Sequence, residues 1–145
     1  MRRRAGAALL AALLLAASAA CAGSSRTDDD YRHKAAHTLG SAVAAARTIT
    51  TGVDGAAAGD LTSAFTSVLV READEDLTAA ADSFRSRQPP SAQADEVRSR
   101  VDELLHRAEQ RAAELRIATQ RGESAPTAPL ADVADRMEQE QEALR

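Results

Sequence analysis

Asp29, His33 and His37 are the residues of this chain whose types and spacing come nearest to a metal site. Residues four apart lie on one face of a helix, and two imidazoles placed in this way can share a divalent cation. A zinc site needs three or four supported ligands, and the third here would be Asp29 at the very start of the helix. We therefore predict no metal or other cofactor and interpret both histidines as surface residues, with weak metal binding as the alternative.

A second metal motif is the pair Glu103 and His106, which is separated by two leucines. Ferritin-like bundles hold two iron ions with two such Glu-x-x-His pairs and two further glutamates, all pointing inward. This chain has one pair. Leu104 and Leu105 belong to the apolar stripe of the predicted helix, so the pair is expected on the opposite side, facing solvent.

The remaining reactive side chains do not combine into a catalytic site. Met137 lies on an apolar helix face, where a core role explains it better than haem ligation. The Ser and Thr hydroxyls have no histidine on a predicted buried face to act as their base. Four carboxylates form an acidic run, Glu72, Asp74, Glu75 and Asp76. Nothing indicates the burial that raises a carboxyl pKa for acid catalysis, so we predict a solvated surface or a docking patch for a basic partner, and no enzyme.

The only cysteine, Cys21, follows a segment with the features of an export signal. Residues 2–4 are arginines, residues 5–17 are an uncharged stretch rich in Ala and Leu, and residues 18–20 are small. The apolar stretch is short for a membrane span, and the small residues after it are typical of a cleavage site. We predict that residues 1–20 are a signal peptide that is removed.

The sequence Ser18-Ala19-Ala20-Cys21 resembles the lipobox of bacterial lipoproteins, with Ser18 at the position that is usually Leu. The resemblance implies that Cys21 is fatty-acylated and becomes the mature N-terminus, followed by a flexible tether over residues 21–27. The alternative is cleavage by an ordinary signal peptidase, which would release a secreted protein. The Ala- and Arg-rich usage, with Lys34 as the only lysine, resembles that of exported proteins from high-GC actinobacteria.

Composition and charge limit what the mature chain can be. The 145 residues leave room for one domain, and their 2% aromatic content suits close helix packing better than β-sheets. Without the three arginines of residues 1–20 the chain has 15 basic and 22 acidic residues, a net charge of −7. Such a domain repels phosphate backbones and anionic membrane surfaces. We therefore predict no nucleic-acid partner and a membrane contact only through the lipid.

The first two helices are predicted from the spacing of apolar residues and from the glycines and prolines that interrupt a helix. The first runs from Asp28 to Thr51, with Thr27 as its N-cap, and ends where Gly52, Asp54-Gly55 and Gly59 interrupt the pattern. The second runs from an N-cap at Asp60 to about Arg87 and stops at Pro89-Pro90. Its predicted apolar residues are Leu61, Phe65, Val68, Leu69, Ala73, Leu77, Ala80 and Phe84.

The last two helices are separated by a linker over residues 123–129 that contains two prolines. Ser91 is the predicted N-cap of the third helix, and Gly122 is its predicted C-terminal stop. The fourth helix, residues 130–144, is short, and it either docks on a three-helix core of residues 28–122 or binds a partner.

The sequence thus predicts an all-α domain, an antiparallel up-down bundle of three long helices and a shorter C-terminal one. We expect a non-enzymatic interaction or structural module of the cell envelope, anchored to the membrane by lipid and in contact with a protein partner. A metal- or small-ligand-binding envelope lipoprotein, with His33 and His37 at the entrance of the site, is the alternative.

Overall fold

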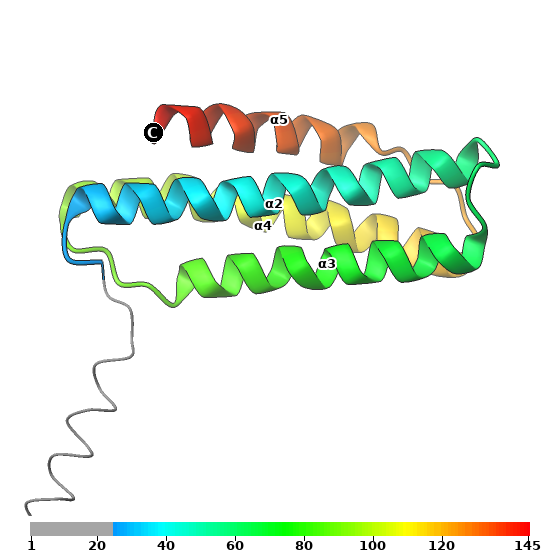
Figure 1. The fold of residues 1–145 in the computed structure, drawn as a ribbon, viewed down its shortest axis with the longest axis horizontal. Helices are drawn as coiled ribbons and strands as arrows, with labels where there is room; N and C mark the ends of the chain where they lie inside the picture. The colour runs from blue at the N-terminus through cyan, green and yellow to red at the C-terminus, as the bar shows by residue number, and fades with distance from the viewer. Residues whose placement is uncertain (1–24) are drawn as a thin grey trace, which may run out of the picture.

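The computed structural model describes residues 25–145, and the predicted signal peptide and Cys21 lie outside this range. The described chain forms four helices, which are α2 (Asp28–Ala57), α3 (Ser63–Arg85), α4 (Ala92–Arg121) and α5 (Ala128–Ala143). They lie side by side along the long axis of the molecule, and residues 25–145 contain no strand (Figure 1). The prediction of an all-helical domain is confirmed. No helix in this range combines the length and the apolar character that a membrane crossing requires.

Local side-chain chemistry explains where α2 and α4 begin and where α4 ends. Thr27 Oγ1 accepts a hydrogen bond from the backbone N–H of Asp30 at 3.1 Å, and Ser91 Oγ accepts one from that of Ala94 at 3.1 Å. Each bond satisfies an N–H that has no partner within its helix. Gly122 ends α4 with φ of 68°, a left-handed conformation that costs glycine little. These three predicted boundaries are confirmed.

The predicted end of the first helix at Thr51 is wrong, because α2 continues through Gly52 and Gly55 to Ala57. Gly52 is buried, and a Cβ atom there would lie 2.9 Å from Leu69 Cδ2 on α3. Its missing side chain therefore provides room for a neighbouring helix and does not mark a break. A helix-interior glycine costs about 1 kcal/mol relative to alanine, which close packing can offset.

The N-cap of α3 is Thr62, and the predicted cap at Asp60 is wrong. The backbone N–H groups of Asp60 and Leu61 both donate to the carbonyl of Gly55, so they still belong to the turn that closes α2. Thr62 Oγ1 instead accepts from the N–H of Phe65 at 3.3 Å. The helix therefore begins two residues later than the sequence pattern indicates.

Helices α2 and α4 form the centre of the bundle. Each contacts the other three helices, whereas α3 and α5 make no contact with one another. The start of α2 and the end of α5 lie at the same end of the bundle (Figure 1), where Arg32 Nη2 donates to the carbonyl of Ala143 at 3.4 Å. The fourth helix is part of the core, because Leu130 and Met137 are fully buried. Two alternatives were predicted for α5, and the structure shows the first of them, in which α5 docks on the other helices.

The core itself combines a few large side chains with many alanines. Ala35, Ala42, Ala46, Ala108 and Ala112 are completely buried. Alanines at helix contacts let backbones approach closely and lose no side-chain entropy on burial. The largest side chains buried to at least 98% are Tyr31, Leu39, Ile49, Thr66, Val70, Leu77, Phe84, Val101, Leu105, Leu130 and Met137.

Tyr31 is a polar side chain in the aromatic part of this core. Its ring packs against Phe84, with centroids 5.7 Å apart and the planes tilted by 48°. The Oη atom is buried and has no hydrogen-bond partner among residues 25–145. Burial raises the pKa of the Tyr31 phenol above the usual 10.0, Arg98 lowers it by a smaller amount, and Asp95 adds a further small rise.

This environment predicts a loss of stability at alkaline pH. Above about pH 10 the unfolded state releases the phenolic proton first, so raising the pH through this range favours unfolding. Tyr31 is the only tyrosine and tryptophan is absent, so near-ultraviolet tyrosinate absorbance reports this single group. We expect a titration midpoint above 10 in the native protein and near 10 in denaturant. A native midpoint equal to the denatured one, or a Tyr31→Phe variant with the same alkaline loss, would contradict the assignment.

Candidate functional site

His33 and His37 lie on the exposed side of α2, near its start. His33 Nε2 is 3.5 Å from Asp29 Oδ2, and the side chains of this pair are 64% and 84% exposed. Both histidines line one shallow hollow between α2 and α5, together with Gln141 and Arg145. Within residues 25–145 no three His, Cys, Asp or Glu side chains are grouped closely enough to hold a metal ion. The hollow therefore offers two imidazoles and no third ligand, an arrangement suited to weak cation binding at most.

Glu103 and His106 lie on the outer face of α4, as predicted. Glu103 forms an ion pair with Arg107 one turn away, and His106 Nε2 lies 3.1 Å from Gln110 Nε2. Leu105, between them in sequence, is completely buried. The motif thus points away from the core, and its side chains interact only along their own helix.

The acidic run on α3 divides between two environments. Asp74 faces α4, where its carboxylate accepts from Arg116 Nε at 2.8 Å and its side chain is only 17% exposed. The prediction of a solvated surface is wrong for this residue, because α4 covers it. Glu75 pairs with Arg71 at 2.8 Å on the outside of α3, and Glu72 and Asp76 are exposed.

An ion-pair cluster around Arg85 joins α3 to α4, and the sequence analysis did not identify it. Its Nη1 and Nη2 atoms donate to the two oxygens of Glu109 at 3.1 and 2.7 Å, and Nε donates to Asp102 Oδ1 at 2.7 Å. These hydrogen bonds raise the pKa of the Arg85 guanidinium above its already high value, Glu109 contributing most. The carboxylates of Asp102 and Glu109 therefore serve a structural contact between α3 and α4. Asp102 and Glu109 lie 17 and 24 residues after Arg85, and such distant pairs leave no periodic pattern in the sequence.

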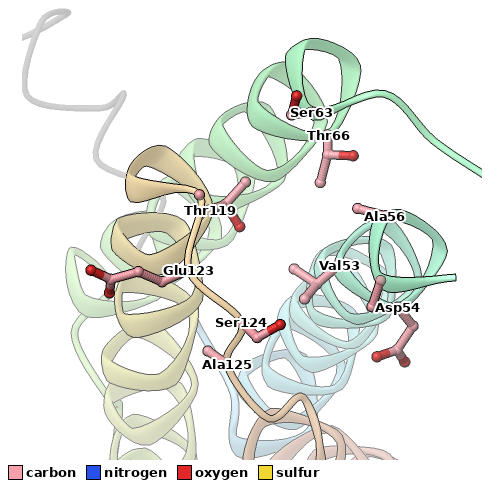
Figure 2. A pocket seen from close by; sticks show the side chains of 11 residues that line it. Val53, Asp54, Ala56, Ser63, Thr66, Thr119, Glu123, Ser124 and Ala125 are labelled. Carbon is pink, nitrogen blue, oxygen red and sulfur yellow. The ribbon is translucent and has the colours of Figure 1, made fainter. Parts of the chain in front are cut away.

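A cavity of about 220 Å³ lies where the end of α2, the start of α3 and the end of α4 meet. Figure 2 shows Thr66 and Thr119 reaching toward it, while the Glu123 carboxylate points away. Thr66 Oγ1 donates to the carbonyl of Thr62 at 3.0 Å, and Thr119 Oγ1 donates to that of Leu115 at 2.8 Å. The lining also includes Asp54, whose Oδ1 accepts a hydrogen bond from Thr127 Oγ1 at 2.9 Å, and it holds neither an imidazole nor a thiol.

Two large apolar side chains of α3 face solvent. Phe65 and Val68, two of the apolar residues of the predicted second helix, are 54% and 48% exposed. The row Phe65, Leu69, Ala73, Leu77 advances by four residues, and each such step turns about 40° around a helix. By the time the row faces the core at Ala73 and Leu77, its first member has turned outward. The buried face is formed by Thr66, Val70, Ala73, Leu77, Ala81 and Phe84.

Comparison with known proteins identifies no relative of this chain. The chain matches no protein-family model, no curated protein and no solved structure.

Proposed function

We propose that this chain is an extracytoplasmic helical lipoprotein, tethered to the outer face of the cytoplasmic membrane through Cys21. Its role is that of a non-enzymatic interaction or structural module of the cell envelope. The sequence of the first 21 residues supports the location. The side-by-side exposure of two large apolar side chains on α3 supports the role.

The exposure of Phe65 and Val68 carries the proposal for an interaction module. The domain buries Phe84 and Leu77 completely on the inner side of α3 but leaves Phe65 and Val68 of the same helix exposed to water. Contiguous exposed apolar groups on a small folded domain commonly mark a contact with another macromolecule. Binding would cover them and recover the hydrophobic free energy that folding leaves unused.

The bundle architecture proposed with this function is the antiparallel up-down arrangement. Two ion pairs between α3 and α4 support it, because the earlier α3 residue pairs with the later α4 residue. Asp74 contacts Arg116, whereas Arg85 contacts Asp102. Such a bundle presents rigid helix faces along its whole length, which suits recognition of another helix.

The location is tested by replacing the proposed acylation site, Cys21→Ser, and fractionating the cells. We expect the wild-type protein in the membrane fraction and at least about 90% of the variant in the medium or soluble envelope fraction, because lipid is the proposed attachment. Metabolic labelling with a fatty acid should mark the wild type only. A wild-type protein that is already soluble would support secretion, and membrane retention of the variant would contradict lipid anchoring.

The interaction is tested by the mass of the protein extracted from membranes in mild detergent. A module that works through a partner is expected in a complex heavier than one chain, and Phe65→Ala should shift material toward the single-chain mass. Recovery of the wild type as a single chain under all extraction conditions would contradict the interaction role.

A further inference from the structure

A shallow groove runs between α2 and α3 on the outer surface of the bundle. Its base consists of small side chains from both helices, and its α3 side includes one large apolar residue, Leu69. The groove is lined over two to three turns of each helix, from residue 41 to 48 on α2 and from 69 to 80 on α3. The small lining residues central to the argument are Ala44, Ala45, Thr48, Ala73 and Ala80. Such short side chains allow a further helix to approach closely.

The exposed apolar residues of α3 continue this groove at one end. Phe65 precedes Leu69 by four residues, so both side chains lie on the same face of α3, one turn apart. Leu69 itself packs over Gly52 of α2, where a Cβ would lie 2.9 Å from its Cδ2 atom. Leu69 thus lines this end of the groove, and the exposed Phe65 and Val68 lie about one helical turn beyond it on α3.

The rim of the groove is acidic, which indicates the charge of its occupant. The carboxylates of Glu72 and Asp76 line it, and no basic side chain does. Arg116 engages the neighbouring Asp74, and Arg71 is shared between Glu75 at 2.8 Å and the rim residue Glu72 at 3.6 Å. Arg47 of α2 is directed to Glu138 on α5 at 2.5 Å. Arg71 therefore balances Glu72 only in part, and residues 25–145 provide no ion-pair partner for Asp76, so the rim has a net negative charge.

We infer that the groove between α2 and α3 binds a basic amphipathic helix of another envelope protein. This inference rests on the proposed interaction function and names its surface and the chemistry of its partner. Apolar side chains of the partner helix would meet Phe65 and Leu69, and its Lys or Arg residues would meet Glu72 and Asp76. A second copy of this chain fits less well, because a symmetric contact would place these two carboxylates against their own counterparts.

The experiment places a photo-crosslinking benzoylphenylalanine at Phe65 or Val68 in the full-length chain, expressed in its own cells. Ile117, 40% exposed on α4, is the matched control position. Each crosslinked partner peptide is sequenced by mass spectrometry. The crosslink is then measured again with Glu72→Lys and Asp76→Lys combined, and with Glu103→Lys and Glu142→Lys combined. The second pair makes the same charge change at exposed carboxylates elsewhere. Circular dichroism verifies that all variants keep their helices.

We expect crosslinks from the groove positions to a segment with Lys or Arg at helical spacing, reduced at least about tenfold by the groove charge reversal and unchanged by the control reversal. Crosslinks to a second copy, to lipid, or to an acidic or uncharged segment would overturn the inference. So would an equal loss with both charge reversals. Crosslinks from Ile117 alone would overturn the groove assignment and leave the interaction function standing. Absence of crosslinks from all three positions would overturn both.

Discussion

Replacing Phe84 by alanine is expected to lower the free energy of unfolding by about 3–5 kcal/mol. Phe84 is completely buried near the end of α3, and its ring packs against that of Tyr31. The substitution removes buried apolar surface and leaves a cavity that rigid helices fill only in part. Urea unfolding followed by circular dichroism measures the loss directly, as a fall in the transition midpoint at unchanged slope.

The chain provides a matched control for this prediction in Phe65, the other phenylalanine, which lies on the same helix and is 54% exposed. Phe65→Ala is expected to change the free energy of unfolding by at most about 0.5 kcal/mol, as surface substitutions usually do. The same change thus separates folding from binding, because Phe65→Ala should impair the partner contact without unfolding the domain. Equal destabilisation by the two substitutions would contradict the packing of α3 described above.

Ending the chain after Gly122, which removes α5, is expected to abolish cooperative unfolding or to lower stability by more than any single substitution. The removed segment contributes four large buried side chains, Leu130, Val133, Met137 and Leu144, and α5 covers the side of the bundle between α2 and α4. Removing it exposes the apolar surface of both partners at once. Since a small domain is stable by only about 5–15 kcal/mol, a loss of this size leaves little margin.

A graded version of the same experiment keeps α5 and changes one residue. Met137→Ala is expected to cost about 2–5 kcal/mol, while Arg136→Ala, its exposed neighbour, should change stability by at most about 0.5 kcal/mol. Urea unfolding of both variants and of the shortened chain gives the comparison. A shortened chain that unfolds at the wild-type midpoint would show that α5 is dispensable and would leave it free for a partner.

The outward direction of the chemistry-bearing residues was predictable from sequence because it depends on helical periodicity alone. Glu103 and His106 flank two leucines of an apolar stripe, and one buried stripe per helix is enough to turn them to solvent. The boundaries at Thr27, Ser91 and Gly122 were predictable for a similar reason. A cap is an interaction within one helical turn, so the residues that form it are neighbours in the chain.

The candidate groove was not predictable in the same way. Both Phe65 and Leu77 fit an apolar pattern on α3, and the side of the helix that becomes covered depends on where α2 and α4 pack. The Arg85 cluster likewise needs Asp102 and Glu109 to arrive from another helix. Gly52 illustrates the same limit, since only the approach of Leu69 shows that its missing side chain is a packing feature.

The helical class, the caps at Thr27 and Ser91 and the outward direction of Glu103 and His106 were predictable from the chain alone, since all of them depend on contacts within a turn or two. The packing of distant helices places α5 in the core, Asp74 against Arg116, and Phe65 and Val68 in water. These outcomes depend on which faces of distant segments meet, and the gain from burying one face is realised only when a neighbour covers it.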